Sequence, residues 1–395
     1  MEAFYRTHKY LVTHLGTPVR RGLMDEVDWS QRLIGIKGCR EIGKTTFLLS
    51  YARECFAPDG RECLYVNLNN FIFTERTLTD FAGEFYANGG KVLLIDQIFK
   101  YPDWSRELRY CYDHYSNLRI VFTGSSVMRI KEENHEVGDI VAPYYLRGFS
   151  FREYLNLKTG LDLQPFSFDM LMRDRHLIAR DICDQVNPGE YFHDYLHHGF
   201  YPFFLEKRNY SENLLKMMNM TLEVDVLYIR QIEQRYLPKL RRLLYLISQN
   251  EPCTLNISQL SKDIGTSRAT VMNYLKYLKD ARMITLLYPR GEEFPQKPVY
   301  VNLYNSNLLH VINRQTQDER TVNEAFFFNQ LLKDNRVNAY DRHNSFLVND
   351  RYLFRVSYPE ARWKVSPDFY YAVDEVEPPL DEPNCIPLWM FGFLY

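Results

Sequence analysis

The stretch Gly38-Cys39-Arg40-Glu41-Ile42-Gly43-Lys44-Thr45-Thr46 decides the fold of the first part of this chain. It holds two glycines separated by four residues and followed by Lys and Thr, and it lies between apolar runs at 33–36 and 47–49. Strand, loop and helix in this order are the setting of a phosphate-binding loop. Because glycine tolerates tight turns, such a loop points successive backbone N–H groups at phosphate oxygens, and the helix adds its positive end.

The motif also assigns roles to individual side chains. Lys44 is expected to reach the β- and γ-phosphates of a nucleotide, and Thr45 is expected to bind Mg²⁺ through its hydroxyl group. Every residue from 38 to 46 is a candidate nucleotide contact, and the predicted cofactors are ATP and Mg²⁺. The alternative is a glycine-containing turn between strand and helix that binds no ligand.

Strand-like and helix-like patterns alternate between residues 31 and 150. Apolar runs at 63–68, 91–96 and 118–126 predict three further strands, with helices at 77–86 and 104–115 between them. The run that ends at Asp96 is typical of a parallel strand buried on both faces. This order predicts a P-loop α/β domain, in which helices cover both faces of a parallel sheet.

Polar residues at the ends of two predicted strands are candidate site residues. Ligands bind at the carboxyl ends of strands in such sheets, so Asp96 is expected to hold Mg²⁺ through water. Ser125, with Thr123 and Ser126 beside it, is a candidate contact to the γ-phosphate or the attacking water. The alternatives are an ordinary acidic strand end and hydroxyl groups that serve a turn.

Length and composition restrict the class of protein. A chain of 395 residues is expected to form two or three domains, and a formal charge of −2 provides no overall attraction to nucleic acid or anionic membranes. The seven cysteines are widely spaced and form no CxxC pair, which favours a reduced, cytoplasmic location and no zinc site. No apolar run approaches the length of a membrane span, so no membrane partner is expected.

Residues 236–315 show the pattern of a winged helix-turn-helix. The expected elements are helices at 240–248, 257–264 and 268–282 and a two-stranded wing at 284–288 and 298–303. Ser267 precedes the third helix and can cap it. The alternative to DNA binding is a module that packs within the protein, and the nearly neutral net charge of the chain favours this alternative. The candidate contacts to a DNA major groove are Arg268, Thr270, Asn273 and Lys276.

The remaining segments complete the expected organisation. The chain ends on the apolar residues 386–395, which are expected to dock as a strand or against the core, with a partner surface as the alternative. The predicted regions are a helix and connector at 1–30, an ATPase core at 31–150, a helical lid at 151–235, a winged helix at 236–315 and a small α+β domain at 316–395.

The chain resembles the bacterial AAA-type ATPases of the AAA_14/DUF4143 kind, common in Bacteroidetes. These proteins join a P-loop module to a winged-helix region and a nuclease-like C-terminal domain of the restriction-endonuclease type, and the resemblance covers nearly the whole chain. Besides residues 32–46, it is carried by Gly89-Gly90-Lys91 with the strand to Asp96, Phe122-Thr123-Gly124-Ser125-Ser126, Ser150-Phe151-Arg152-Glu153-Tyr154-Leu155, Tyr201-Pro202-Phe203, Asn323-Glu324-Ala325-Phe326-Phe327 and residues 386–395.

The sequence departs from this family at the position after Asp96. Family members usually carry a glutamate there, which orients and polarises the attacking water. Here the residue is Gln97, and an amide cannot accept the proton, so nucleotide binding is expected to survive while hydrolysis is slow. Two origins are compatible with Gln97, a natural substitution or one introduced to trap ATP.

Two further departures concern arginines and nuclease ligands. Where the family carries a Ser-Arg-Arg element this chain has residues 137–141 without arginine, and Arg147 lies a few residues further on. In the C-terminal region Ser345 and Arg355 stand where relatives carry acidic metal ligands, although Glu324 and Lys364 remain. Nuclease activity is therefore not expected.

These observations predict an ATP- and Mg²⁺-binding AAA-type protein that acts as a nucleotide-dependent switch or assembly subunit. Its ligands are expected to be ATP and ADP, and its assembly is expected to be a homo- or hetero-oligomer. One alternative is a DNA-binding regulator or a defence-type ATPase that uses the winged helix. Another is an interaction scaffold that uses the aromatic-rich lid and the apolar C-terminus.

Overall fold

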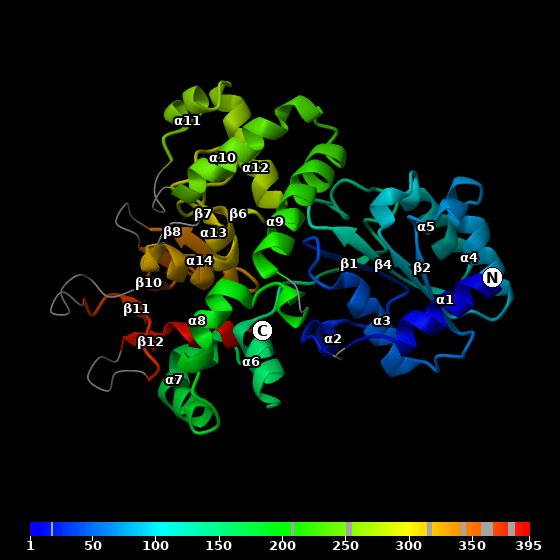
Figure 1. The fold of residues 1–395 in the computed structure, drawn as a ribbon, viewed down its shortest axis with the longest axis horizontal. Helices are drawn as coiled ribbons and strands as arrows, with labels where there is room; N and C mark the ends of the chain where they lie inside the picture. Colours follow the sequence, from blue (N-terminus) through cyan, green and yellow to red (C-terminus); the bar gives the residue numbers. More distant parts are fainter. Residues whose placement is uncertain are drawn as a thin grey trace. The chain divides into compact units, whose positions relative to one another are not determined.

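The computed structural model describes residues 1–16, 19–206, 209–249, 255–313, 318–340, 345–356, 366–377 and 384–395. The chain divides into two compact units, Met1–Arg147 (unit 1) and Gly148–Tyr395 (unit 2). Figure 1 shows the ribbon of both units in sequence colours. Among the described residues, no helix combines the length and the apolar character that crossing a membrane requires.

Unit 1 is built on a five-stranded sheet of order β2-β3-β4-β1-β5 in which every neighbouring pair is parallel. The strands are β1 (Leu33–Gly38), β2 (Cys63–Asn67), β3 (Val92–Asp96), β4 (Arg119–Ser125) and β5 (Ala142–Tyr145). The parallel sheet and its first four strands confirm the prediction. The fifth strand was not predicted, because it is short, lies at the edge of the sheet and contains Pro143.

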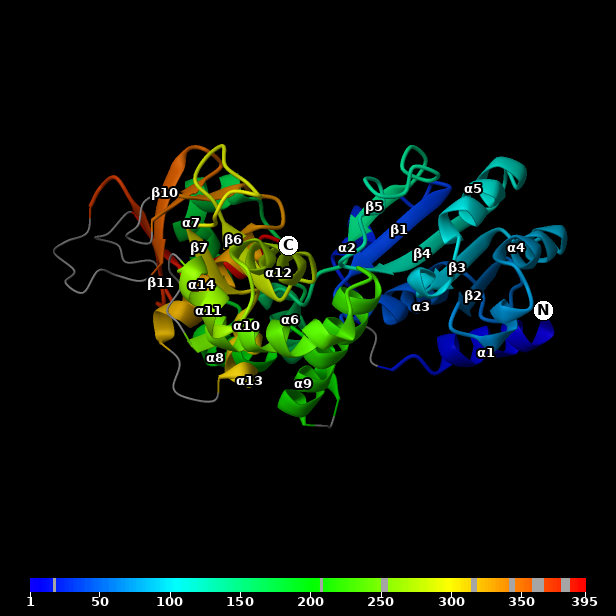
Figure 2. The ribbon, with the colours of Figure 1, turned by 90° about the horizontal axis from the view of Figure 1, so that it is seen from above.

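Helices cover both faces of this sheet, as predicted, and Figure 2 shows them on its two sides. One face carries α1 (Glu2–Thr13) and α3 (Lys44–Cys55), and the other carries α4 (Leu78–Ala87) and α5 (Trp104–His114). Shorter helical turns connect these elements: α2 (Leu23–Glu26), η1 (Phe71–Thr74) and η2 (Ile98–Lys100).

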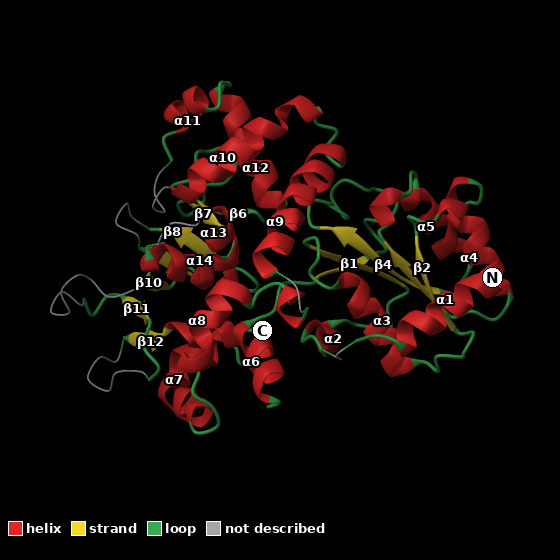
Figure 3. Cartoon of the chain, viewed as in Figure 1, coloured by secondary structure: helices red, strands yellow, loops and turns green. Residues whose placement is uncertain are grey.

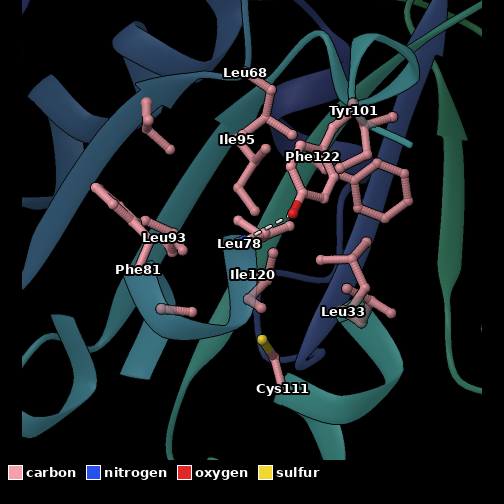
Figure 4. Close-up of a cluster of buried hydrophobic side chains, with 14 of the residues drawn as sticks. Leu33, Leu68, Leu78, Phe81, Leu93, Ile95, Tyr101, Cys111, Ile120 and Phe122 are labelled. Atoms are coloured by element: carbon pink, nitrogen blue, oxygen red, sulfur yellow. Dashed lines mark hydrogen bonds between the residues drawn. The ribbon is translucent and has the colours of Figure 1, made fainter. Parts of the chain in front are cut away.

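The strand register aligns apolar side chains into one core between the sheet and the pair α4 and α5 (Figure 4). Leu33 is opposite Ile120, which is opposite Leu93 on the next strand. Each such side chain contributes about 1.5–3 kcal/mol when it is fully buried. Tyr101 closes one side of this cluster, and its hydroxyl accepts the backbone N–H of Leu78 at 3.2 Å. This core holds the strands rigidly, so their carboxyl ends form a fixed edge.

Unit 2 begins with the mostly helical region that the sequence predicts. Its helices are α6 (Phe151–Thr159), α7 (Phe168–Cys183), α8 (Gly189–His198) and α9 (Tyr210–Met220), with 3-10 turns η3 (Pro202–Leu205) and η5 (Gln234–Tyr236) and a π-helix η4 (Thr221–Tyr228). Helix α10 (Leu237–Gln249) follows, where the sequence predicts the first helix of the winged helix-turn-helix at 240–248. Ser150 and Glu153 form a capping box at the start of α6, which satisfies two backbone N–H groups at once.

The next elements follow the order helix, helix and two-stranded hairpin. They are α11 (Ile257–Asp263), α12 (Arg268–Asp280) and the antiparallel strands β6 (Ile284–Leu287) and β7 (Tyr300–Leu303). Ser267 caps α12 as predicted, because its hydroxyl oxygen accepts the N–H of Thr270 at 3.1 Å. Val271, Leu275 and Leu278 are the buried face of this helix.

A second sheet, of order β12-β11-β10-β9-β8, forms the last part of unit 2 (Figure 3). Two pairs are parallel, β10 with β11 and β11 with β12, and the other two pairs are antiparallel. The strands of this sheet are β8 (Val337–Ala339), β9 (Phe346–Val348), β10 (Tyr352–Val356), β11 (Tyr370–Val373) and β12 (Cys385–Pro387). This part of unit 2 also contains helices α13 (Ser306–Ile312) and α14 (Glu319–Leu331) and the turn η7 (Leu388–Phe393). The apolar end of the chain is docked as predicted, since Leu388 to Phe393 are all buried.

Candidate nucleotide site

The phosphate loop connects the end of β1 to the start of α3. Gly38 ends the strand, and a Cβ atom there would lie 2.5 Å from the carbonyl oxygen of Leu146, so only glycine fits. Gly43 has φ 94° and precedes the first turn of α3, a conformation that a side chain would strain. Glu41 also has a positive φ of 55°. The backbone therefore turns tightly at each end of the loop, as the motif predicts.

Lys44 holds its charge within this loop. Its Nζ donates hydrogen bonds to the carbonyl oxygen of Gly38 at 3.0 Å and to that of Cys39 at 2.5 Å. Thr45 and Thr46, on the first turn of α3, are exposed. A bound anion would thus meet the ammonium group, the hydroxyl groups and the N-terminal end of α3 together.

Asp96 is the residue that joins the loop to the sheet. Its side chain ends β3 and is only 1% exposed. The hydroxyl group of Thr45 donates to Asp96 Oδ2 at 2.6 Å, and the hydroxyl group of Tyr65 donates to the same oxygen at 2.9 Å. The structure therefore places the two predicted metal residues, Thr45 and Asp96, in direct contact. Hydroxyl and carboxylate oxygens of this kind suit Mg²⁺.

The other carboxylate oxygen of Asp96 is also held. The hydroxyl group of Thr123 donates to Oδ1 over a short distance, and the backbone N–H of Gln97 reaches Oδ1 at 3.1 Å and Thr123 Oγ1 at 3.0 Å. Gln97 has φ 59° and ψ 49°, a left-handed conformation that costs a non-glycine residue about 1 kcal/mol or more. Its backbone N–H is thus aimed at two oxygens at the point where β3 ends.

Ser125 lies beside the first glycine of the loop, since the register pairs it with Gly38. It is 4% exposed, and its hydroxyl oxygen accepts the N–H of Val127 at 3.5 Å. Thr123, two residues earlier on β4, is the hydroxyl residue that contacts Asp96. Strand β4 therefore brings the Thr123 hydroxyl group to Asp96 and places Ser125 opposite the first glycine of the phosphate loop.

Two residues near the site were not predicted from the sequence. Tyr65 belongs to β2, where an aromatic residue looks like ordinary core. Burial and the charge of Asp96 raise the pKa of its hydroxyl group, so the group stays protonated and donates. Arg21 is 7% exposed and donates to the carbonyl oxygens of Ile42 at 3.4 Å and Arg147 at 2.7 Å. Only the fold brings these side chains to the loop.

The segment that replaces the family's arginines forms a turn in unit 1. Val137 and Val141 are buried there, and Asp139 forms an ion pair with Arg109 of α5 at 3.1 Å. Arg147, the other candidate arginine, has a buried side chain. The ion pair of Asp139 with Arg109 thus attaches residues 137–141 to helix α5 of the same unit.

The candidate DNA contacts lie on α12 but differ in their surroundings. Arg268 and Asn273 are exposed, whereas Thr270 is partly buried with its hydroxyl oxygen 2.8 Å from that of Ser267. Lys276 places its Nζ 4.7 Å from the ring centre of Phe294. Two of the four candidates thus present open side chains.

Glu324, which the sequence singled out only through a resemblance to nuclease-like domains, forms its contacts within unit 2. Its side chain is fully buried and accepts hydrogen bonds from the Tyr300 hydroxyl at 2.9 Å and from Arg320 Nε at 3.0 Å. Burial raises the pKa of this carboxyl group to about 7. Within the described ranges, no group of three or more His, Cys, Asp or Glu residues is placed to hold a metal ion. Lys364 lies outside the described residues.

Comparison with known proteins gives this geometry a class. Residues 30–155 match the family model of an AAA domain, and residues 189–302 match a domain of unknown function, DUF8612. The first match spans the phosphate loop, Asp96 and the end of β4. Residues 30–155 are therefore an AAA-type ATPase domain of the P-loop kind.

Relatives and solved structures extend the comparison. Two uncharacterized proteins of Methanocaldococcus jannaschii, MJ1637 and MJ1544, are 24% and 25% identical over 66% and 64% of this chain. The chain spans only 58% and 55% of their lengths. Among solved structures, the Aeropyrum pernix ORC1 protein in complex with DNA is 11% identical with a TM-score of 0.31, covering 82% of this chain and 91% of that one. Caenorhabditis elegans PCH-2 is 14% identical with a TM-score of 0.27, covering 70% and 66%.

Proposed function

We propose that unit 1 binds ATP with Mg²⁺ and acts as a nucleotide-dependent switch or assembly subunit that hydrolyses ATP slowly. The observation that carries the proposal is the 2.6 Å hydrogen bond between Thr45 and Asp96. It joins the residue expected to bind the metal to the carboxylate expected to hold the metal's water shell.

Different groups around the loop are expected to bind the phosphates and the metal ion. Backbone N–H groups of residues 39–46 and the start of α3 hold the phosphates, and Lys44 neutralises their charge by moving from the Gly38 and Cys39 carbonyl oxygens. Thr45 and Asp96 are the residues that would hold Mg²⁺: Thr45 through its hydroxyl oxygen, and Asp96 through the metal's waters once the Thr45 hydroxyl group no longer donates to Oδ2. The metal would shield the phosphate charges while these side chains hold the nucleotide in place.

Slow hydrolysis follows from Gln97. A carboxylate in this position takes the proton of the attacking water, and general-base catalysis of this kind contributes roughly 10²–10⁴-fold in rate. The amide of Gln97 can orient a water molecule but cannot take its proton. A protein that keeps its nucleotide for long periods is suited to signal occupancy, for example by ordering a segment or a partner surface.

A binding experiment tests the site directly. Titration of the full chain with a fluorescent ATP analogue and Mg²⁺ should show saturable binding, and Lys44→Ala should weaken it at least tenfold, because a charged contact to phosphate is lost. Lys91→Ala is the matched control, since Lys91 is an exposed lysine of the same unit that pairs with Glu62. Normal ATP binding by Lys44→Ala would rule out the assigned site.

DNA binding is a second candidate function, favoured by the exposed side chains of Arg268 and Asn273 on a capped helix. With Thr270 and Lys276 they would line the face presented to a major groove. A salt-dependent gel shift that Arg268→Ala weakens would support it. Arg235→Ala is the control and should leave the shift unchanged, because Arg235 is an exposed arginine of η5 that pairs with Glu233 at 2.8 Å. The absence of a shift at low salt, with and without ATP, would remove it.

Self-assembly or capture of a partner is the expected output of the switch. Sizing chromatography of the full chain with ATP, with ADP and without nucleotide distinguishes the outcomes. A larger species only with ATP supports an assembly subunit, a nucleotide-independent complex supports an interaction scaffold, and a monomer throughout contradicts homo-oligomerisation.

A further inference from the structure

Asp96 is held from both neighbouring strands. In the sheet, β3 lies between β2 and β4. Tyr65 of β2 donates to Asp96 Oδ2, and Thr123 of β4 donates to Asp96 Oδ1. The carboxylate therefore sits between two hydroxyl groups that rigid strands present from opposite sides.

The Tyr65 contact falls on the oxygen that matters for the metal. Oδ2 is also the acceptor of the Thr45 hydroxyl group. Torsions that end in a carboxylate are broad and roughly two-fold, so the orientation of the Asp96 carboxylate depends on its donors, which are Thr123 and the Gln97 N–H on Oδ1 and Thr45 and Tyr65 on Oδ2. With Tyr65 in place, both lone-pair directions of Oδ2 have donors in this structure, and the plane of the carboxylate is set.

The chemistry of Tyr65 suits a permanent donor. The side chain is 6% exposed, so its ring is buried in unit 1. Burial, followed by the charge of Asp96, raises the pKa of the phenol. The hydroxyl group directs its proton to the carboxylate, with the phenol oxygen 2.9 Å from Asp96 Oδ2.

We propose that Tyr65 is a positioning residue that orients Asp96 for Mg²⁺ in the nucleotide site. The proposal rests on the ATP- and Mg²⁺-binding function inferred above. Tyr65 acts through Asp96 and has no contact with the nucleotide, so its loss affects the metal-dependent part of binding and spares the rest.

The test compares Tyr65→Phe with the unmodified chain. The affinity for a fluorescent ATP analogue is measured in EDTA and along a Mg²⁺ titration. We expect affinity in EDTA to change less than twofold, while the Mg²⁺ concentration for half-maximal effect rises about tenfold, because a hydrogen bond to a charged group is lost. An unchanged Mg²⁺ requirement in Tyr65→Phe overturns the proposal, and so does an equal loss of affinity with and without Mg²⁺.

Tyr101→Phe is the matched control. Tyr101 is a buried tyrosine of the same unit that donates to a carboxylate oxygen of Glu107 at 2.8 Å, away from the loop. We expect it to keep the wild-type Mg²⁺ requirement even if it lowers the melting temperature. A shift as large as that of Tyr65→Phe would mean that any lost tyrosine–carboxylate bond has this effect, which overturns the proposal.

A second measurement covers the case in which Tyr65→Phe does not fold. A fluorotyrosine placed at position 65 keeps both ring and hydroxyl group, and its ¹⁹F NMR signal is expected to shift when Mg²⁺ is added to the nucleotide-bound chain. A signal that Mg²⁺ leaves unmoved overturns the proposal. If the unmodified chain shows no Mg²⁺-dependent nucleotide binding, the proposed function itself fails, which is a separate result.

Discussion

Replacing Glu324 by glutamine should remove a pH dependence from the stability of unit 2. Glu324 is fully buried on α14, where it accepts hydrogen bonds from Tyr300 and from Arg320. Burial raises its pKa from 4.5 to about 7 in the folded chain. The neutral acid is therefore favoured in the folded protein and the carboxylate is favoured in the unfolded chain.

The sign and size of the effect follow from linkage. The contribution of a raised carboxyl pKa is fully present below the unfolded value and is lost as pH rises through the folded value. At 1.36 kcal/mol per pKa unit, the loss between pH 4.5 and pH 8 amounts to roughly 3 kcal/mol. Glutamine keeps an acceptor for Tyr300 but does not titrate, so Glu324→Gln should gain about this much relative to wild type.

The assay is urea unfolding of the full chain at pH 5 and pH 8, monitored by a spectroscopic signal that reports the unfolding of unit 2. The measured quantity is the difference in free energy of unfolding between variant and wild type at each pH. Glu319→Gln, an exposed acid on the same helix, is the control and should show no change with pH. If the difference in unfolding free energy between Glu324→Gln and wild type is the same at both pH values, the pKa of Glu324 is not raised in the folded protein, which contradicts the prediction.

Two further predictions concern the backbone. Gly38→Ala should disrupt the phosphate loop and abolish ATP binding, because its Cβ atom would lie 2.5 Å from the Leu146 carbonyl oxygen. Gly16→Ala is the control and should leave ATP binding unchanged, since a Cβ atom there has no neighbour within 4 Å. Normal ATP affinity in Gly38→Ala would contradict the loop geometry. Ser267→Ala should lower the stability of unit 2 by about 1 kcal/mol in urea unfolding, because α12 loses the cap to the Thr270 N–H; an unchanged midpoint would show that the cap contributes nothing.

The elements of unit 1 were predictable where the hydrophobic pattern was unambiguous. The run before Asp96 is apolar throughout and proved to be the fully buried β3. The motif at 38–46 and the strand end at Asp96 marked Thr45 and Asp96 as candidate metal residues, but the sequence did not predict the hydrogen bond that the structure shows between them. Strand β5 was not predicted, because its four residues include a proline and show no alternation of apolar and polar side chains.

What the sequence did not reveal was the order of the strands. No local pattern shows that β4, the last of the first four strands, inserts between β1 and β3. That insertion brings Thr123 to Asp96 and Ser125 to Gly38. The role of Tyr65 was hidden for the same reason, because contacts between residues of different strands depend on which strands are neighbours.

We propose that this chain holds ATP with Mg²⁺ but turns it over slowly, because Gln97 stands where a carboxylate would take the proton of the attacking water. The most direct test measures ATP binding and single-turnover hydrolysis for the chain as it stands and for Gln97→Glu. We expect similar ATP binding by both chains and hydrolysis at least tenfold faster in Gln97→Glu, in keeping with the usual contribution of a general base. Robust turnover by the chain with Gln97 in place, or no gain from the glutamate, would contradict it.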